Sequence, residues 1–180
     1  MDDSAKNELL LLARQTLDCY LRTEQIPPYR TERPELLSRQ GAFVTLHKGV
    51  ELRGCIGRLT PRDPLFLTVQ QCAISAARED SRFLPVKSEE LPDLSIEISV
   101  LAPSLTIRDP LQVIVGEHGL MISRRERRGL LLPQVATENC WDRATFLAQT
   151  CRKAGLPEDA WRDPATRVEI FTAYVFSEHS

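Results

Sequence analysis

The 180-residue chain has no CxxC pair, no closely spaced histidines and no long apolar run. Its five cysteines are odd in number, and His47, His118 and His179 lie far apart. These absences argue against a disulfide framework and against a zinc site of the CxxC type. A bilayer-spanning helix needs about 20 apolar residues, and the acidic start MDDSAKNE does not resemble a secretory signal. We therefore expect a cytoplasmic protein with no membrane segment and no locally encoded metal site.

An excess of positive charge is also missing. Lys and Arg number 23 against 25 Asp and Glu, which gives a net charge of -2. Such a balance provides no overall attraction to nucleic acid or to an anionic membrane. The basic cluster SRRERRG at residues 123–129 is either a solvated turn or a docking patch for phosphate, RNA or an acidic partner. Nucleic-acid binding would depend on this cluster alone, so we do not favour it.

What is present is the pattern of an α+β protein. Apolar spacing predicts an amphipathic helix over 4–22, another that starts at Asp63 and Pro64, and a third over 141–154. We expect Asp3 or Ser4 to cap the first, Asp63 the second and Asp142 the third. Alternating runs predict a hairpin around residues 47–49, a strand over 94–102, a second hairpin turning at 116–119 and a long last strand over 166–176. We expect a mostly antiparallel sheet with packed helices, as one domain over 1–180 made of two intimately associated subdomains.

The stretch LRGCIG, residues 52–57, is the most unusual feature of the predicted strands. Glycine weakens a strand interior, so it often marks a bend or a close approach of another group. In a regular strand Arg53, Cys55 and Gly57 share one face, with Arg53 and Cys55 about 7 Å apart between Cα atoms. A neighbouring cation favours the reactive thiolate, and the N-terminus of the following helix is expected nearby, where an anion would bind.

Two interpretations of Cys55 remain open. It is either an activated thiol or a small side chain buried where the hairpin bends. Arg53 either binds an anion or forms a structural salt bridge to Glu97 or Asp80. For the glycines, we expect Gly54 to face the core beside a helix and Gly57 to leave open space beside the Cys55 thiol.

Several longer motifs together resemble one family. They are LRGCIG at 52–57, SRFLPV at 81–86, LPQVATENCWD at 132–142 and CRKAGL at 151–156. In this order they resemble the AMMECR family, in particular its bacterial and archaeal branch, the AmmeMemoRadiSam system protein A. The resemblance implies an α+β fold in two subdomains and genes beside a Memo-like protein and a radical SAM protein. It does not imply an established reaction.

Two hypotheses about function follow. In the first, the chain is an enzyme or enzyme subunit that acts on a small molecule or a protein side chain. Cys55 and Arg53 would be catalytic, and Glu97, Gln134 and Glu138 would line the cleft with Gly54 and Gly57. In the second, the chain is a non-catalytic adaptor that presents a groove near LRGCIG to the Memo-like or radical SAM protein.

The cysteine pattern gives a first prediction. Because the cysteines are odd in number and lack ligand spacing, folding should need neither a disulfide nor stoichiometric zinc. Thermal melts recorded with a reductant or with a chelator should therefore overlay the untreated curve. A loss of many degrees under either treatment would contradict this expectation.

Overall fold

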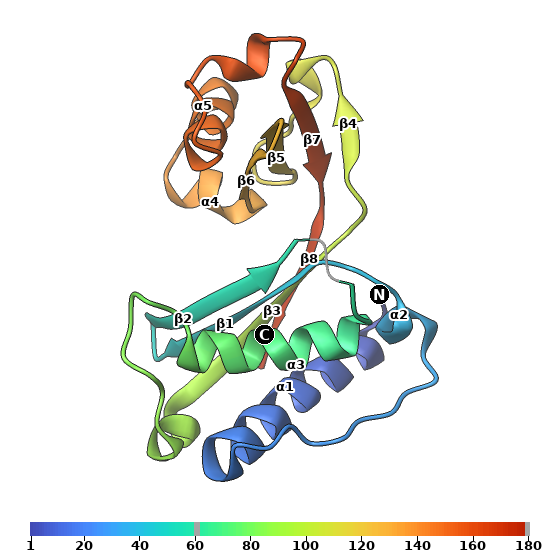
Figure 1. Ribbon diagram of the computed structural model, residues 1–180, viewed down its shortest axis with the longest axis vertical. Helices are drawn as coiled ribbons and strands as arrows, with labels where there is room; N and C mark the ends of the chain where they lie inside the picture. The colour runs from blue at the N-terminus through green and yellow to red at the C-terminus, as the bar shows by residue number, and fades with distance from the viewer. Residues whose placement is uncertain (60–61, 179–180) are drawn as a thin grey trace. The chain divides into compact units, whose positions relative to one another are not determined.

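The computed structural model describes residues 1–59 and 62–178, which divide into two compact units. The first unit comprises residues 1–101 together with the C-terminal residues from Tyr174, and the second comprises Ala102–Ala173. Each unit holds one four-stranded sheet and its own helices (Figure 1). The α+β prediction is confirmed.

The first unit is a sheet with helices packed on one face. Its strands, in the spatial order β2-β1-β3-β8, are β2 (Glu51–Arg58), β1 (Ala42–Lys48), β3 (Leu94–Leu101) and β8 (Ala173–Ser177). The long helices α1 (Asp3–Thr23) and α3 (Leu65–Arg78) lie on the same side of this sheet (Figure 1). The short α2 (Pro34–Leu37) packs on α3, and the 3-10 helix η1 (Ser88–Asp93) leads into β3.

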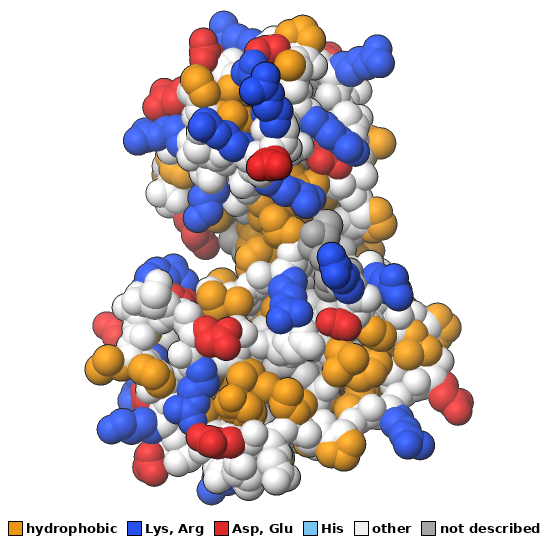
Figure 2. Space-filling view, viewed as in Figure 1, with side chains coloured by type: hydrophobic (Ala, Val, Ile, Leu, Met, Phe, Trp, Pro, Cys, Tyr) orange, Lys and Arg blue, Asp and Glu red, His pale blue; other side chains and the backbone are white. Residues whose placement is uncertain are grey.

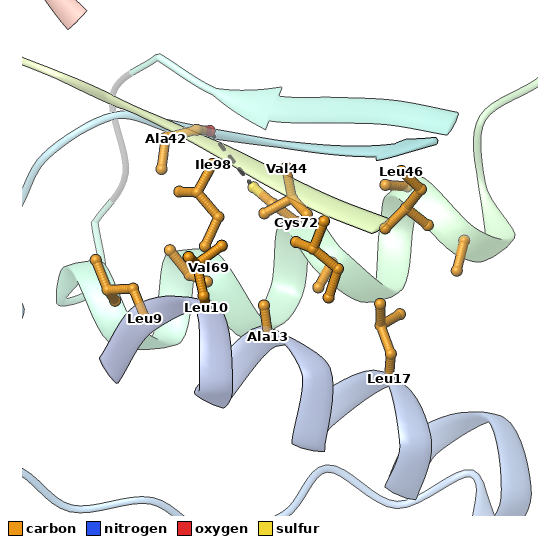
Figure 3. Close-up of a cluster of buried hydrophobic side chains, with 14 of the residues drawn as sticks. Leu9, Leu10, Ala13, Leu17, Ala42, Val44, Leu46, Val69, Cys72 and Ile98 are labelled. Carbon is orange, nitrogen blue, oxygen red and sulfur yellow. Dashed lines mark hydrogen bonds between the residues drawn. The ribbon is translucent and has the colours of Figure 1, made fainter. Parts of the chain in front are cut away.

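The core of the first unit lies between this sheet and the two long helices. Val44 and Leu46 of β1 and Ile98 of β3 are fully buried, and they meet Leu9 and Val69 from the helices (Figure 3). The alternate residues of β1 are only partly buried, as expected for a strand whose other face carries polar side chains. The sheet therefore presents a second, more accessible face on the side opposite the helices.

The C-terminal end of the chain is anchored by one arginine of α1. Arg14 donates to the carbonyl oxygens of Leu91 and Leu94, at 2.9 and 2.7 Å, and pairs with the carboxylate of Glu178. Glu178 also accepts a hydrogen bond from the amide of Ile96 at 2.9 Å. These contacts hold β8 as the fourth strand of a sheet whose other strands come from residues 42–101.

The second unit has a separate sheet and a separate core. Its strands, in the order β4-β7-β5-β6, are β4 (Leu105–Ile107), β7 (Arg167–Phe171), β5 (Gly119–Arg124) and β6 (Arg127–Leu131). Its helices are η2 (Pro110–Gln112), α4 (Pro133–Glu138), α5 (Arg143–Lys153) and η3 (Ala160–Arg162). α5 packs on β5 and β6, where it buries Phe146 and Leu147.

Some predicted boundaries were wrong. The last run, expected as one strand over 166–176, divides at Thr172 into β7 and β8, which belong to different sheets. The expected hairpin turn at 116–119 is not between strands, because residues 110–112 form η2 and the strand begins at Gly119. The hairpin of this region is β5–β6, which turns within the SRRERRG cluster.

Helix capping was predicted correctly in one case out of three. Asp142 caps α5 by accepting the Thr145 amide at 2.7 Å. α1 is capped by Asp2 instead of the expected Asp3 or Ser4, and α3 has Pro64 as its N-cap with no capping side chain. Each helix therefore starts within two residues of the sequence-based position.

Among the described residues, no helix has both the length and the apolar character needed to cross a bilayer. Basic and acidic side chains are interspersed over the visible face of each unit (Figure 2).

The close approach of β2 to α3 generates a prediction. A Cβ added to Gly54 would lie 2.2 Å from the Ala76 carbonyl oxygen. Gly54→Ala must therefore push the backbone of β2 away from that of α3. A Cβ at Gly57 would meet the Phe43 ring, a side chain that can move. We expect Gly54→Ala to lower the free energy of unfolding by about 3 kcal/mol and Gly57→Ala by about 1 kcal/mol, as measured by urea denaturation. Equal losses would show that contact with the α3 backbone is not the dominant constraint.

Candidate functional site

Cys55 lies on the accessible sheet face of the first unit, in the edge strand β2. It pairs with Thr45 of β1, and Thr45 in turn pairs with Glu97 of β3. Because directly paired residues project to the same face, the three side chains form one row across the sheet. The Thr45 hydroxyl donates a hydrogen bond to the Cys55 sulfur at 3.2 Å.

The other cysteines differ from Cys55 in their surroundings. Cys72 and Cys151 are buried, and burial raises the pKa of both thiols, that of Cys72 to about 11. The Cys72 thiol donates to the Ala42 carbonyl at 3.6 Å (Figure 3). Cys140 is exposed, and Cys19 is partly buried like Cys55. Cys55 is thus a partly accessible thiol set in a polar sheet face.

Asp80, just after α3, holds both the backbone of Cys55 and a cation. Its Oδ2 accepts the Cys55 amide at 2.9 Å, and its two oxygens accept Nε and Nη2 of Arg82 at 2.9 and 2.7 Å. Nη2 of Arg82 also reaches the Cys55 carbonyl oxygen, at 3.4 Å. We call these three residues, Cys55, Asp80 and Arg82, the thiol clamp.

The two charges of the thiol clamp are unequally exposed. The Asp80 side chain is 5% exposed and that of Arg82 is 55% exposed. The hydrogen bonds from Arg82, and after them that from the Cys55 amide, hold the pKa of Asp80 well below its usual range, against the opposing effect of burial. The pKa of Arg82 is raised, chiefly by its hydrogen bond to Asp80. The clamp therefore presents an accessible cation beside the Cys55 backbone.

Arg53 is held by an ion pair with Glu90. The β1–β2 register shifts between Leu46 and His47, so Arg53 has no partner on β1 and the strand is not regular there. Its guanidinium forms a bidentate pair with Glu90, at 3.0 Å to both oxygens, and donates to the Leu84 carbonyl at 2.9 Å. The bond from Arg53 lowers the pKa of Glu90. The structural interpretation of Arg53 holds, but its partner is Glu90 and not Glu97 or Asp80.

The two glycines of LRGCIG both allow close packing. Gly54 faces α3, as expected. The prediction that Gly57 leaves space beside Cys55 was wrong, since the Phe43 ring of the neighbouring strand covers it. The N-terminus of α3 was expected near Cys55, but Gly54 contacts Ala76, near the opposite end of that helix.

Two further titratable side chains share the face with Cys55. Glu97 lies two strands away in the same row and forms no hydrogen bond or ion pair with the described residues. His47 belongs to β1, where it alternates with Thr45 and lies diagonal to Cys55 at a Cα separation of about 7–8 Å. Both positions allow a role in proton transfer toward a bound molecule.

Gln134 and Glu138 belong to the second unit. They lie in the short helix α4. The thiol clamp is built entirely from the first unit and includes neither of them. Within residues 1–59 and 62–178, no group of three or more His, Cys, Asp or Glu side chains could hold a metal ion.

Comparison with known proteins places the chain in a family. The AMMECR1 family model matches residues 10–176. The chain belongs to the AMMECR1 family. Proteins of Thermococcus gammatolerans and Methanothermobacter thermautotrophicus are each 46% identical to it, over 182 and 177 residues. These matches cover 94% of this chain and 88% and 92% of the two relatives.

A solved structure in the AMMECR1 family has the same fold. The crystal structure of the uncharacterized protein PH0010 from Pyrococcus horikoshii aligns with a TM-score of 0.92 at 42% identity. The alignment covers 99% of this chain and 93% of that one. The family and the α+β fold are therefore established.

Sequence reasoning missed the residues that contact Cys55. The motif SRFLPV was recognised as a family feature, but Arg82 within it was given no role, and Asp80 was considered only as a partner of Arg53. Thr45 was not considered. The available signal was the run EDSRFLPV directly after a predicted helix. It carries opposite charges two residues apart, at Asp80 and Arg82, and such a segment can fold back so that both side chains contact a neighbouring strand.

The low pKa of Asp80 generates a prediction about pH. A carboxyl group whose pKa is lowered on folding stabilises the native state above the unfolded-state value of about 3.9, and this stabilisation is lost as the pH falls from there. Asp80→Asn should lower the free energy of unfolding at pH 7 by about 2 kcal/mol. At pH 3 the difference from the wild type should be clearly smaller.

A matched control is Asp18→Asn, which removes an exposed carboxylate paired with Arg22 in α1. Such a pair contributes about 0.3–0.5 kcal/mol, so this variant should change little at either pH. Urea denaturation at both pH values measures the free energy of unfolding of the wild type, Asp80→Asn and Asp18→Asn. An Asp80→Asn effect that is the same at pH 3 and pH 7 would mean that the charge of Asp80 does not stabilise the fold.

Proposed function

We propose that this AMMECR1-family protein is an enzyme or enzyme subunit that uses the Cys55 thiol on a small molecule or a protein side chain. It acts in the cytoplasm as part of an AmmeMemoRadiSam system, together with a Memo-like protein and a radical SAM protein. The observation that carries the proposal is the thiol clamp, in which one buried carboxylate fixes both the Cys55 backbone and the Arg82 cation.

The clamp suits nucleophilic chemistry at sulfur. Attack by a thiol requires negative charge on the sulfur, and a neighbouring cation stabilises that charge. Asp80 fixes the position of Arg82, so the guanidinium need not reorganise when the charge forms. The Thr45 hydroxyl donates to the sulfur itself at 3.2 Å, whereas Arg82 donates to the Cys55 carbonyl oxygen.

Arg53 and Glu90 support this site without taking part in the reaction. Their bidentate pair joins β2 to η1 and, through the Leu84 carbonyl, to the segment that carries Arg82. Both side chains of this pair are mostly buried. Arg53 is therefore a positioning residue in the proposed function and not a catalytic one.

Alkylation kinetics test the proposal. At neutral pH the Cys55 thiol should react with iodoacetamide several-fold faster than Cys19, measured by mass mapping over time. Cys19 is the matched control, because it is also partly buried and its sulfur also lies near a threonine hydroxyl, that of Thr23 at 3.5 Å. Arg82→Gln should reduce the Cys55 rate to about that of Cys19, since the loss of a charge-assisted contact costs about tenfold.

A second variant separates the role of charge from that of structure. Arg82→Lys keeps the cation and should retain part of the enhanced rate. If Cys55 and Cys19 react at the same rate in the wild type, or if Cys55 is protected until the protein unfolds, Cys55 is a structural residue and the enzymatic proposal fails.

An adaptor function is the alternative, and one observation favours it. Leu84 is 83% exposed, and its carbonyl oxygen accepts the bond from Arg53, which places this apolar side chain beside the strand that carries Leu52. Exposed large apolar residues that lie together are typical of protein interaction sites. The SRFLPV motif would then contribute a docking contact for the Memo-like or radical SAM protein.

Co-purification with the two partner proteins tests this alternative. Leu84→Asp should abolish retention of the partner while leaving the Cys55 alkylation rate unchanged. Leu11→Asp, which changes an exposed leucine of α1, is the control and should retain the partner. Retention by Leu84→Asp would exclude docking through this side chain.

A further inference from the structure

A pocket of about 500 Å³ lies in the second unit and includes none of the thiol clamp residues. It forms where β4 ends, where β7 begins and where the η3 segment passes. Its volume falls in the range of pockets that hold small organic molecules, about 300–1,000 Å³.

Part of the pocket is apolar. Ile107 of β4 and Val168 of β7 line it and are direct partners in the antiparallel register. Trp161 of η3 contributes a partly buried aromatic ring. An aromatic ring and two aliphatic side chains together offer a surface for a flat apolar group.

The charged side chains of the pocket leave an excess of positive charge. Arg108 and Arg162 both line it, and neither forms an ion pair within the part of the chain that the structure describes. The Arg162 guanidinium lies over the Trp161 ring, 4.7 Å from its centroid. Asp163, the one acidic residue of the lining among the described residues, is already paired with Arg124 at 3.0 Å and accepts the Ala165 amide at 2.9 Å.

A buried hydroxyl in the lining has no partner among the described residues. Thr166 is 8% exposed, and its Oγ1 is buried without a hydrogen bond to any of them. An unpaired buried hydroxyl costs roughly 1–3 kcal/mol, so native proteins rarely leave one without a ligand or a water molecule. This orphan group, in a pocket that also carries two arginines without ion pairs, points to a polar ligand.

We propose that this pocket binds a small organic anion, in which a carboxylate or phosphate group meets Arg108, Arg162 and the Thr166 hydroxyl while an apolar, preferably aromatic, body lies against Trp161, Ile107 and Val168. Arginine donates to both head groups in the same way, because each presents two oxygens in a plane that matches the guanidinium. The pocket is thus a ligand site of the second unit, separate in sequence and in chemistry from the thiol clamp.

A nuclear magnetic resonance titration of the full chain tests the proposal. Phenyl phosphate and benzoate serve as the two anionic probes, with inorganic phosphate and neutral benzyl alcohol as comparisons. At least one anionic probe should shift the Trp161 indole N–H signal to saturation below about 10 mM, a range typical of weak specific ligands. Trp161→Phe assigns that signal, and Trp141 provides an internal reference. The tighter of the two probes identifies the head group.

Variants of the lining then separate specific binding from general charge effects. Arg108→Gln and Arg162→Gln should each weaken binding of the preferred probe about tenfold. Lys153→Gln removes a positive charge from the same unit at an exposed position outside the pocket, and its affinity should equal that of the wild type. Thr166→Val should weaken binding about threefold or more without lowering the thermal midpoint, because the hydroxyl holds no part of the fold.

Several results would overturn the assignment. They are the absence of saturation by either anionic probe, equal affinity for benzyl alcohol, and an effect of Lys153→Gln as large as that of the two pocket arginines. Equal affinity for inorganic phosphate and phenyl phosphate would refute the apolar half of the site. A lower thermal midpoint for Thr166→Val would show that the hydroxyl stabilises the fold and is not reserved for a ligand.

Discussion

The bidentate pair of Asp80 with Arg82 is the interaction on which the candidate site depends. Asp80 is nearly buried, and its carboxylate is satisfied by Arg82 on one side and by the Cys55 amide on the other. This arrangement requires β2 to approach the end of α3 closely. Gly54 permits that approach, since any side chain there would collide with the Ala76 carbonyl. Gly54 thus permits both the packing of β2 on α3 and the contacts of Asp80 and Arg82 with the Cys55 backbone.

The parts of the fold that the sequence could predict are those that depend on local periodicity. The helices over 4–22 and 141–154 and the strand over 94–102 follow from local periodicity, and the structure confirms them within a few residues. The division of the last run into β7 and β8 was missed because its alternation continues through Thr172, and the choice of sheet depends on distant strands. The β5–β6 turn was misplaced because Arg125, and not a glycine, adopts the left-handed conformation there, with a φ of 55°.

The candidate site was predicted in outline but not in its chemistry. Cys55 and the core-facing Gly54 were located correctly, because both depend only on alternation along one strand. The pairing of Arg53 with Glu90 was not predicted, since a register shift between two strands cannot be read from either strand alone. Long side chains add to the difficulty, because Arg53 and Arg82 each reach partners that their own strand or loop does not specify. Gln134 and Glu138 were included through the family motif, and they lie in the other unit.

The two units differ in the kind of chemistry that they offer. The first holds a partly accessible thiol fixed by a buried carboxylate, and the second holds an apolar pocket lined by two arginines. A thiol suits covalent chemistry, whereas the pocket suits reversible binding. The two proposed sites lie in different units of the chain.

The central claim is that Asp80 acts on Cys55 through Arg82. A double-mutant cycle on the Cys55 alkylation rate, with Asp80→Asn, Arg82→Gln and the double variant, tests it most directly. If the carboxylate serves to hold the guanidinium beside the sulfur, the double variant should react no more slowly than Arg82→Gln alone. If the two single effects multiply in the double variant, Asp80 and Arg82 act on Cys55 independently, and the clamp is not a functional unit.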